Sequence, residues 1–282
     1  MIRIAWGLVA LHAAALLLGL FGLLVAIPHP EMWAGHPADL AFFAFALKKT
    51  GGSGMVLGAV AMLAFGFARL GVRRTLLFFC ASCLISASAE LTGTKTGWPF
   101  GGYEYTDFLG YKLLGRVPFA VPLSWFYMGF ASLLLADAIA AARGWSNRTG
   151  LSIVLAAYLL TAWDLVLDPS MAAPQLQYIH FWIWHEHGPY FGMPLRNLAG
   201  WFGTGFAFIA VGRLLWRERF APAVPVLLPF TVYAVNILWS MVLSVSAGMW
   251  QTAIAALLFS LAPAALAVIP QELPRRGRLA KA

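Results

Sequence analysis

The sequence predicts an all-α, polytopic transmembrane helical bundle of about eight helices with both termini in the cytoplasm. Only 11% of its 282 residues are charged and 61% are hydrophobic. A soluble domain carries about 25% charged residues, so a surface with this composition must face lipid. Apolar segments of spanning length recur along the chain, and basic residues gather on one side of them, which favours a multi-pass protein of the cell membrane.

The apolar segments set the number of helices, because a spanning helix needs about 20 mainly apolar residues. The predicted spans are residues 5–27, 54–70, 75–92, 118–141, 149–167, 197–216, 223–243 and 249–269. The first span is longer than the apolar core of a signal peptide, so we interpret it as a membrane helix. The segment 38–47 is too short to span; it either extends the second helix or lies at the interface.

The distribution of charge supports this count. With eight helices, most of the 19 lysines and arginines fall on the side of the termini, which the positive-inside rule assigns to the cytoplasm. The net charge of +8 therefore points to membrane topology and not to nucleic acid. We expect one transmembrane domain, residues 1–270, followed by a basic cytoplasmic tail, residues 271–282.

Three carboxyl groups lie inside the predicted helices, where ionisable side chains are costly and are candidates for function. Glu90 lies at the end of the third span, and Asp164 and Asp168 lie at the end of the fifth. The two aspartates are four residues apart and so share one helix face. Pro169 is expected to end this helix directly after them.

Two connections, residues 92–117 and 168–196, are unusually long and rich in aromatic residues, glycine and proline. Two predicted helices separate them, so they should lie on the same face of the membrane. Connections in bundles are usually short, and long ones tend to carry function. We expect the connections and the following helix to line an elongated apolar pocket, with contributions from Trp98, Phe100, Tyr103, Tyr105, Tyr190, Asn197 and Trp201.

Three interpretations of the carboxyl groups are open from the residues alone. They cap helices or pair with nearby basic residues; they bind a metal with the histidines that follow; or they act as general acids and bases in an apolar site. The metal interpretation is weakened by the spacing of His185, Glu186 and His187, which matches no helical ligand pair. No metal site is predicted.

Four blocks of sequence resemble the membrane carotenoid biosynthesis family of the carotenoid 1',2'-hydratase and bisanhydrobacterioruberin hydratase type. They are residues 90–106, 117–125, 164–169 and 190–201, and they occur in fixed order between about residues 86 and 205. The first helix pair and the last two helices carry little of the resemblance. It implies that water adds across the terminal double bond of an acyclic ψ end group and gives a tertiary alcohol. The implied substrates are linear or monocyclic C40 and C50 carotenoids, such as lycopene or γ-carotene, dissolved in the bilayer lipid, and no cofactor is implied.

The reaction that the resemblance implies makes chemical demands that residues of this sequence can meet. Hydration of an alkene begins with proton delivery to the less substituted carbon, which leaves a tertiary cation. We expect Asp164 or Asp168 to donate this proton with Glu90 as partner, because a carboxylic acid in an apolar site can stay protonated near neutral pH. A second carboxylate or His180 would accept the proton of the attacking water. Aromatic faces would stabilise the cation; the candidates are Trp98, Trp125, Tyr127 and Trp163.

Two alternatives come from other classes of protein. Carboxyl groups within the membrane also occur in transporters, but the sequence has no evident inverted repeat, and the carboxyl groups lie toward one surface. Another enzyme that modifies a prenyl lipid is the second alternative. The sequence makes no prediction of oligomeric state.

Overall fold

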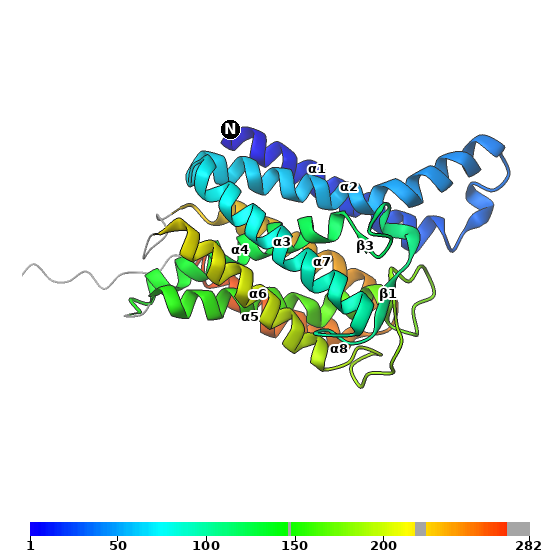
Figure 1. Cartoon of the computed structure of the whole chain (residues 1–282). Helices are drawn as coiled ribbons and strands as arrows, with labels where there is room; N and C mark the ends of the chain where they lie inside the picture. Colours follow the sequence, from blue (N-terminus) through cyan, green and yellow to red (C-terminus); the bar gives the residue numbers. More distant parts are fainter. Residues whose placement is uncertain (146–147, 218–223, 270–282) are drawn as a thin grey trace, which may run out of the picture.

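The computed structural model is an all-α bundle and describes residues 1–145, 148–217 and 224–269 (Figure 1). Its long helices are α1 (Ile2–Phe21), α2 (Pro37–Arg69), α3 (Val72–Thr96), α4 (Ala120–Ala142), α5 (Arg148–Ala172), α6 (Arg196–Trp216) and α7 (Leu227–Ser246). Shorter helical pieces are η1 (Gly22–Ala26), η2 (Pro30–Met32), η3 (Asp107–Leu109), α8 (Trp250–Ala256), η4 (Leu257–Leu261) and α9 (Ala262–Ala265). The strands are β1 (Tyr103–Tyr105), β2 (Lys112–Leu113), β3 (Val117–Pro118) and β4 (Trp182–Trp184).

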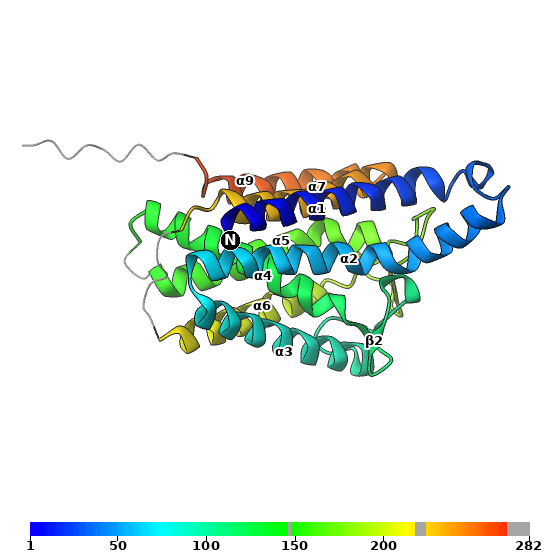
Figure 2. The same cartoon turned by 90° about the horizontal axis from the view of Figure 1, so that it is seen from above.

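The predicted multi-pass membrane architecture is confirmed. Among the described residues, seven helices are long and apolar enough to cross a membrane, and α8, η4 and α9 continue into one another as a shorter apolar helix, Trp250–Ala265. The start of α1 and the end of α9 lie at the same end of the bundle (Figure 2). The cytoplasmic location of this end and the single-domain organisation stay predictions, and residues 271–282 lie outside the described residues.

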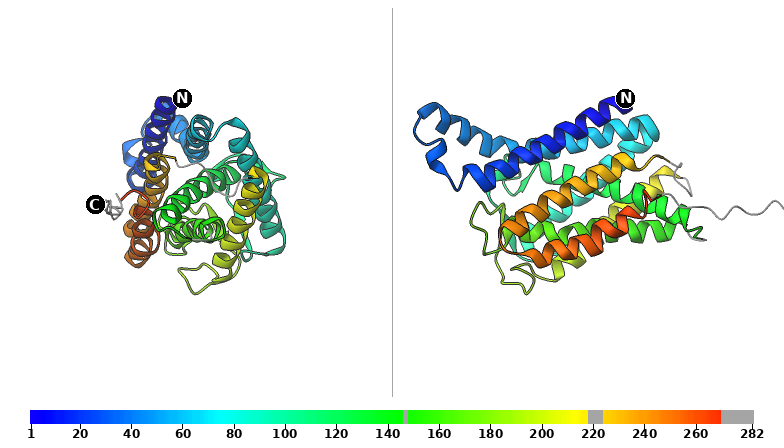
Figure 3. Two further views of the ribbon diagram at one scale, coloured as in Figure 1. Left: turned by 90° about the vertical axis from the view of Figure 1, so that its left-hand side faces the viewer. Right: turned by 180° about the vertical axis from the view of Figure 1, so that it is seen from behind.

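Helix α4 forms the centre of the bundle and is the most buried of the long spans. It packs against α2, α3, α5 and α7, and α6 packs against α3 and α5 and also contacts α4 (Figure 3). Glycines allow the close approach of α6, since a Cβ atom at Gly129 or Gly212 would come within 2.5 Å of the rings of Phe208 or Phe78. This packing brings the first turns of α6 beside the end of α5.

Two predicted helices are longer in the structure. Residues 38–47 extend the second helix, because α2 begins at Pro37 and its first half projects beyond the rest of the bundle (Figure 1). Helix α3 continues to Thr96, past the predicted end at residue 92. It stops at Gly97, which adopts a left-handed φ of 78° and donates its N–H to the Gly93 carbonyl at 2.7 Å, a glycine C-cap.

The prediction that Pro169 ends the fifth helix is wrong, because α5 continues to Ala172. Proline has no N–H, so the carbonyl of Leu165 loses its usual helical partner. The hydroxyl of Tyr190 donates a hydrogen bond to this carbonyl at 2.8 Å. A side chain from the following connection therefore replaces the missing backbone donor, and the helix turn that carries Asp168 stays regular.

The two long connections lie together at one end of the bundle, as predicted. Strand β1 pairs with β4 in antiparallel register, with Tyr103 opposite Trp184 and Tyr105 opposite Trp182. Two further backbone bonds extend the contact: Thr106 N–H to the Phe181 carbonyl at 3.0 Å and His185 N–H to the Gly102 carbonyl at 2.8 Å. The small sheet covers the ends of α3 and α5 and so closes the bundle above their carboxyl groups.

Candidate active site

The carboxyl groups of Asp164 and Asp168 form a buried pair on one face of α5. The side-chain amide of Asn197, at the start of α6, donates to Asp164 Oδ2 at 2.7 Å and to Asp168 Oδ2 at 2.6 Å. Each aspartate is at most 4% exposed. One amide nitrogen thus holds both acids next to each other, out of water, where two negative charges would repel strongly.

Glu90 is the third buried carboxyl group and is bound by three donors. The indole of Trp125 donates to Oε1 at 2.8 Å, the hydroxyl of Tyr105 donates to Oε2 at 3.0 Å, and the hydroxyl of Tyr103 donates to the same oxygen. Burial, with a contribution from Glu90, raises the pKa of Tyr103 and of Tyr105 well above the usual range, so both phenols stay protonated donors. Both oxygens of Glu90 are therefore held in place.

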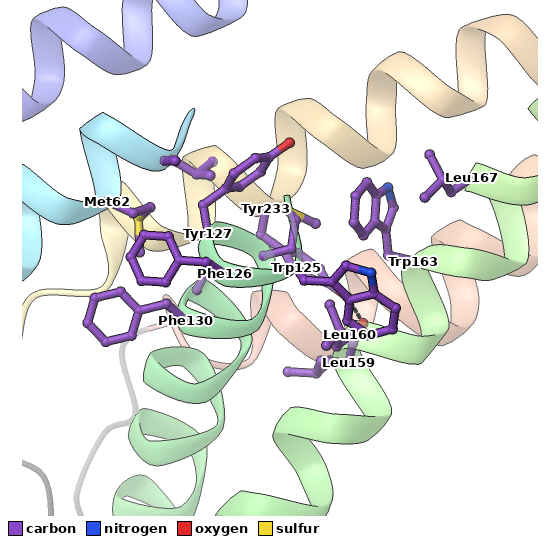
Figure 4. Packing of buried hydrophobic residues seen from close by; sticks show 14 of the residues in the cluster. Met62, Trp125, Phe126, Tyr127, Phe130, Leu159, Leu160, Trp163, Leu167 and Tyr233 are labelled. Carbon is purple, nitrogen blue, oxygen red and sulfur yellow. Dashed lines mark hydrogen bonds between the residues drawn. The ribbon is translucent and has the colours of Figure 1, made fainter. Parts of the chain in front are cut away.

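Tryptophan rings form the wall between the carboxyl groups. Trp125 stacks on Trp201 with ring centroids 4.1 Å apart, and Trp163 meets Trp201 edge to face at 5.8 Å. Trp125 extends from α4 toward α5, where Trp163 lies (Figure 4). The ring of Phe100 fits between glycines of α3 and α6, since a Cβ atom at Gly93 or Gly200 would approach it within 2.8 Å. The site is consequently closely packed and rich in aromatic faces.

These groups surround one mainly apolar cavity of about 230 Å³. Glu90 and Asp168 line it, whereas Asp164 lies one helix turn behind Asp168 and does not. The predicted residues that line the cavity are Phe100, Tyr103, Tyr105, Trp125, Tyr127, Trp163, Asn197 and Trp201. The structure therefore brings most of the predicted site residues to one place.

Besides Asp164, three predicted site residues do not line the cavity. Trp98 is 71% exposed at the end of α3. Tyr190 supports the Leu165 carbonyl, as described above. His180 contacts the Ala173 carbonyl through Nε2 at 3.1 Å. Glu90 and Asp168 thus line the cavity, whereas His180 does not.

Within the described part of the chain, no three His, Cys, Asp or Glu side chains gather as a metal-binding group. Glu186, between the two histidines of the sequence motif, forms an ion pair with Arg196 and accepts the Gly102 N–H at 3.0 Å. These bonds lower the pKa of Glu186, with that from Arg196 as the largest cause. Through both bonds, Glu186 ties the connection after α3 to the start of α6, next to Asn197.

The sequence analysis missed the part of the cavity wall that comes from α1 and α7. Asn236 and Trp239 of α7 line the cavity. The amide of Asn236 accepts a hydrogen bond from the Tyr127 hydroxyl at 2.9 Å, and His12 lies 3.0 Å from the amide nitrogen. A histidine and an asparagine inside apolar spans are the sequence signal that could have identified these helices.

The bond from Tyr190 to the Leu165 carbonyl gives a stability prediction. Tyr190→Phe leaves the part-buried Leu165 carbonyl without this partner, which costs about 0.5–1.5 kcal/mol. We expect a lower melting temperature for the detergent-purified variant by differential scanning fluorimetry. Tyr111→Phe, at a side chain that is 73% exposed, is the matched control. Equal melting temperatures for the two variants would contradict this role of Tyr190.

Comparison with known proteins places the chain in a family. Residues 51–263, about three quarters of the chain, match the family model described as "Carotenoid biosynthesis protein". Over 133 residues the chain is 39% identical to a bisanhydrobacterioruberin hydratase of Haloarcula japonica. This match covers 47% of the chain and 43% of the relative, so it spans less than half of either protein. No solved structure matches the chain.

The family match includes α3 to α7 and therefore every carboxyl group, tryptophan and tyrosine of the cavity described above. The match begins near the middle of α2 and leaves α1 outside. The family predicted from the four sequence blocks is confirmed. This multi-pass membrane protein belongs to the carotenoid biosynthesis protein family.

Proposed function

We propose that this protein is a carotenoid hydratase that adds water across the terminal C1'=C2' double bond of an acyclic ψ end group. The observation that carries the proposal is one apolar cavity lined by Asp168, Glu90 and several tryptophans, with Asp164 paired to Asp168 through Asn197. The similarity to a bisanhydrobacterioruberin hydratase supports the same reaction class. Linear or monocyclic carotenoids are the proposed substrates.

Asp168 is the proposed proton donor. An isolated alkene needs a strong acid, and an acid pair in an apolar site retains one proton, since two adjacent carboxylates cannot both ionise easily. Asp168 lines the cavity, so its proton can reach the less substituted alkene carbon. Asp164 and Asn197 orient it from behind, because the side-chain amide of Asn197 donates a hydrogen bond to each of the two aspartates.

The tertiary cation forms at the terminal carbon that carries the two methyl groups. The faces of Trp125, Trp163 and Trp201 stabilise it, at about 0.5–2 kcal/mol for each cation–π contact. Water then forms the new carbon–oxygen bond and releases its proton to Glu90, which Tyr103 and Tyr105 hold in position. Return of this proton to Asp168 through water completes the cycle, and one water molecule is consumed for each double bond.

Two unpartnered atoms support a place for this water. Among the described residues, the indole Nε1 of Trp163 and Oδ1 of Asp164 are buried and have no hydrogen-bond partner. A carotenoid is a hydrocarbon and cannot satisfy either group, but a water molecule can donate and accept. Trp163 lines the cavity, so a water molecule bound to its indole N–H would lie beside the cation.

The proposal is tested with purified protein in lipid vesicles that contain lycopene or γ-carotene, with no redox partner. We expect a product heavier by one water molecule, and heavy oxygen in the product when the water is labelled. Label that enters from molecular oxygen instead would assign an oxygenase. If no carotenoid gains water in well-folded protein, the proposed reaction is wrong, and uptake of labelled prenyl lipids into the vesicles would then test the transporter alternative.

A further inference from the structure

The cavity extends from the carboxyl groups to the outer surface of the bundle between α1 and α2. Its lining includes Leu18 and Phe21 of α1 and Phe42 of α2. These side chains are 55%, 48% and 64% exposed, respectively. A residue that lines a cavity and is also exposed marks its opening, so the cavity has a lateral mouth at these three residues.

This mouth faces the region that lipid occupies. Helix α1 has the highest mean hydropathy of the seven long spans, 2.5, and is also the least buried. A helix that is apolar all round and has little contact with the protein must meet hydrocarbon on its outer face. The mouth on this helix therefore opens into the bilayer and not into water.

Small residues keep the passage behind the mouth wide. Gly19, Gly22 and Gly54 line the cavity, and a Cβ atom at Gly22 would meet no atom within 4 Å. Trp239 of α7 forms the third side: its indole N–H donates to the Leu16 carbonyl at 3.0 Å and so fixes α7 against α1. The passage is a groove framed by α1, the first half of α2 and α7.

We infer that this groove binds the polyene chain of the substrate and admits its end group sideways from the bilayer. The inference rests on the proposed function and adds where the unreactive polyene part of the substrate binds. The whole cavity, with the groove included, has a volume of about 230 Å³, smaller than the roughly 300–1,000 Å³ of pockets for drug-sized ligands. It holds only one end of a carotenoid, so the rest of the molecule must pass through the mouth into lipid.

The groove is tested with Gly22→Phe, which puts a bulky ring into the passage, and with Gly7→Phe as the matched control. Gly7 is on the same helix, also has open space around its Cβ position, and does not line the cavity. Lycopene is titrated into detergent-purified protein, and its binding is followed by the quenching of tryptophan fluorescence. Both variants also carry Asp168→Asn, so that binding is measured without turnover.

We expect Gly22→Phe to weaken lycopene binding about tenfold or more, the effect of a cavity overfilled by one side chain, and Gly7→Phe to leave it unchanged. Equal binding by the two variants would overturn the inference, as would a parent protein that binds no lycopene. If Gly22→Phe does not fold, Gly22→Ala and Gly22→Leu replace it. The affinity for lycopene should then be lower for Gly22→Leu than for Gly22→Ala, while the melting temperatures of the two variants stay equal. Binding by Gly22→Leu as tight as that of the parent would overturn the inference.

The binding experiment separates this inference from the proposed reaction. A protein that binds lycopene through the groove but never hydrates a carotenoid would leave the groove in place and refute the hydratase. A protein that hydrates carotenoids equally well with phenylalanine at position 22 would keep the hydratase and refute the groove.

Discussion

Replacing Asp168 by asparagine is expected to lower the rate of carotenoid hydration by about 10²–10⁴-fold, the usual contribution of a general acid. Asparagine keeps the shape of the side chain but has no proton acidic enough for an alkene. Lycopene binding should stay near the wild-type value, since the apolar and aromatic lining is unchanged. The measurement is the single-turnover rate in vesicles, read from the masses of the extracted pigments.

Two further aspartate variants distinguish the acid from its support. Asp164→Asn should lower the rate less than Asp168→Asn, because Asp164 lies behind Asp168 and does not line the cavity. Asp39→Asn, on the exposed start of α2, should hydrate normally. If Asp164→Asn is the inactive variant and Asp168→Asn is active, the two roles are reversed.

Replacing Glu90 by glutamine should have the second largest effect, about 10²-fold or more on the turnover rate, because the amide cannot accept the proton of the attacking water. The amide also turns an NH₂ group toward either the Trp125 indole or the two phenols, so at least one donor loses its acceptor. We expect slower hydration and also a lower melting temperature, measured on the same purified sample.

Tyr103→Phe is the matched control for Glu90. It removes one of the three donors and leaves the carboxylate, so hydration should continue at a reduced rate. Burial raises the pKa of Tyr103 and Tyr105 above the usual 10, so these donors keep their protons at alkaline pH. If raising the pH toward 10 lowers the activity of the wild type but not of Tyr103→Phe, the Tyr103 phenol is not protonated as expected. Full activity in Glu90→Gln would exclude Glu90 as the base.

Composition and hydropathy were sufficient for the fold class, and they also marked three carboxyl groups that the structure buries. Long apolar segments must become helices in a membrane, because every backbone N–H and C=O needs a partner inside the segment. Glu90, Asp164 and Asp168 are conspicuous in such segments because placing a carboxyl group in an apolar environment is costly. The two long connections indicated the same end of the bundle, which the pairing of β1 with β4 confirms.

Partners that are distant in the chain were decided by packing alone. Pro169 signals a helix end locally, yet the hydroxyl of Tyr190, 21 positions further on, supplies the missing donor. Trp98 and Trp125 belong to equally aromatic segments, but one is exposed and the other binds Glu90. Hydropathy cannot make this distinction, because the side chains that face lipid and those that face a cavity are of the same apolar kind. For the same reason, the contribution of α1 and α7 to the cavity, and the position of Asp168 in front of Asp164, emerge only from the tertiary structure.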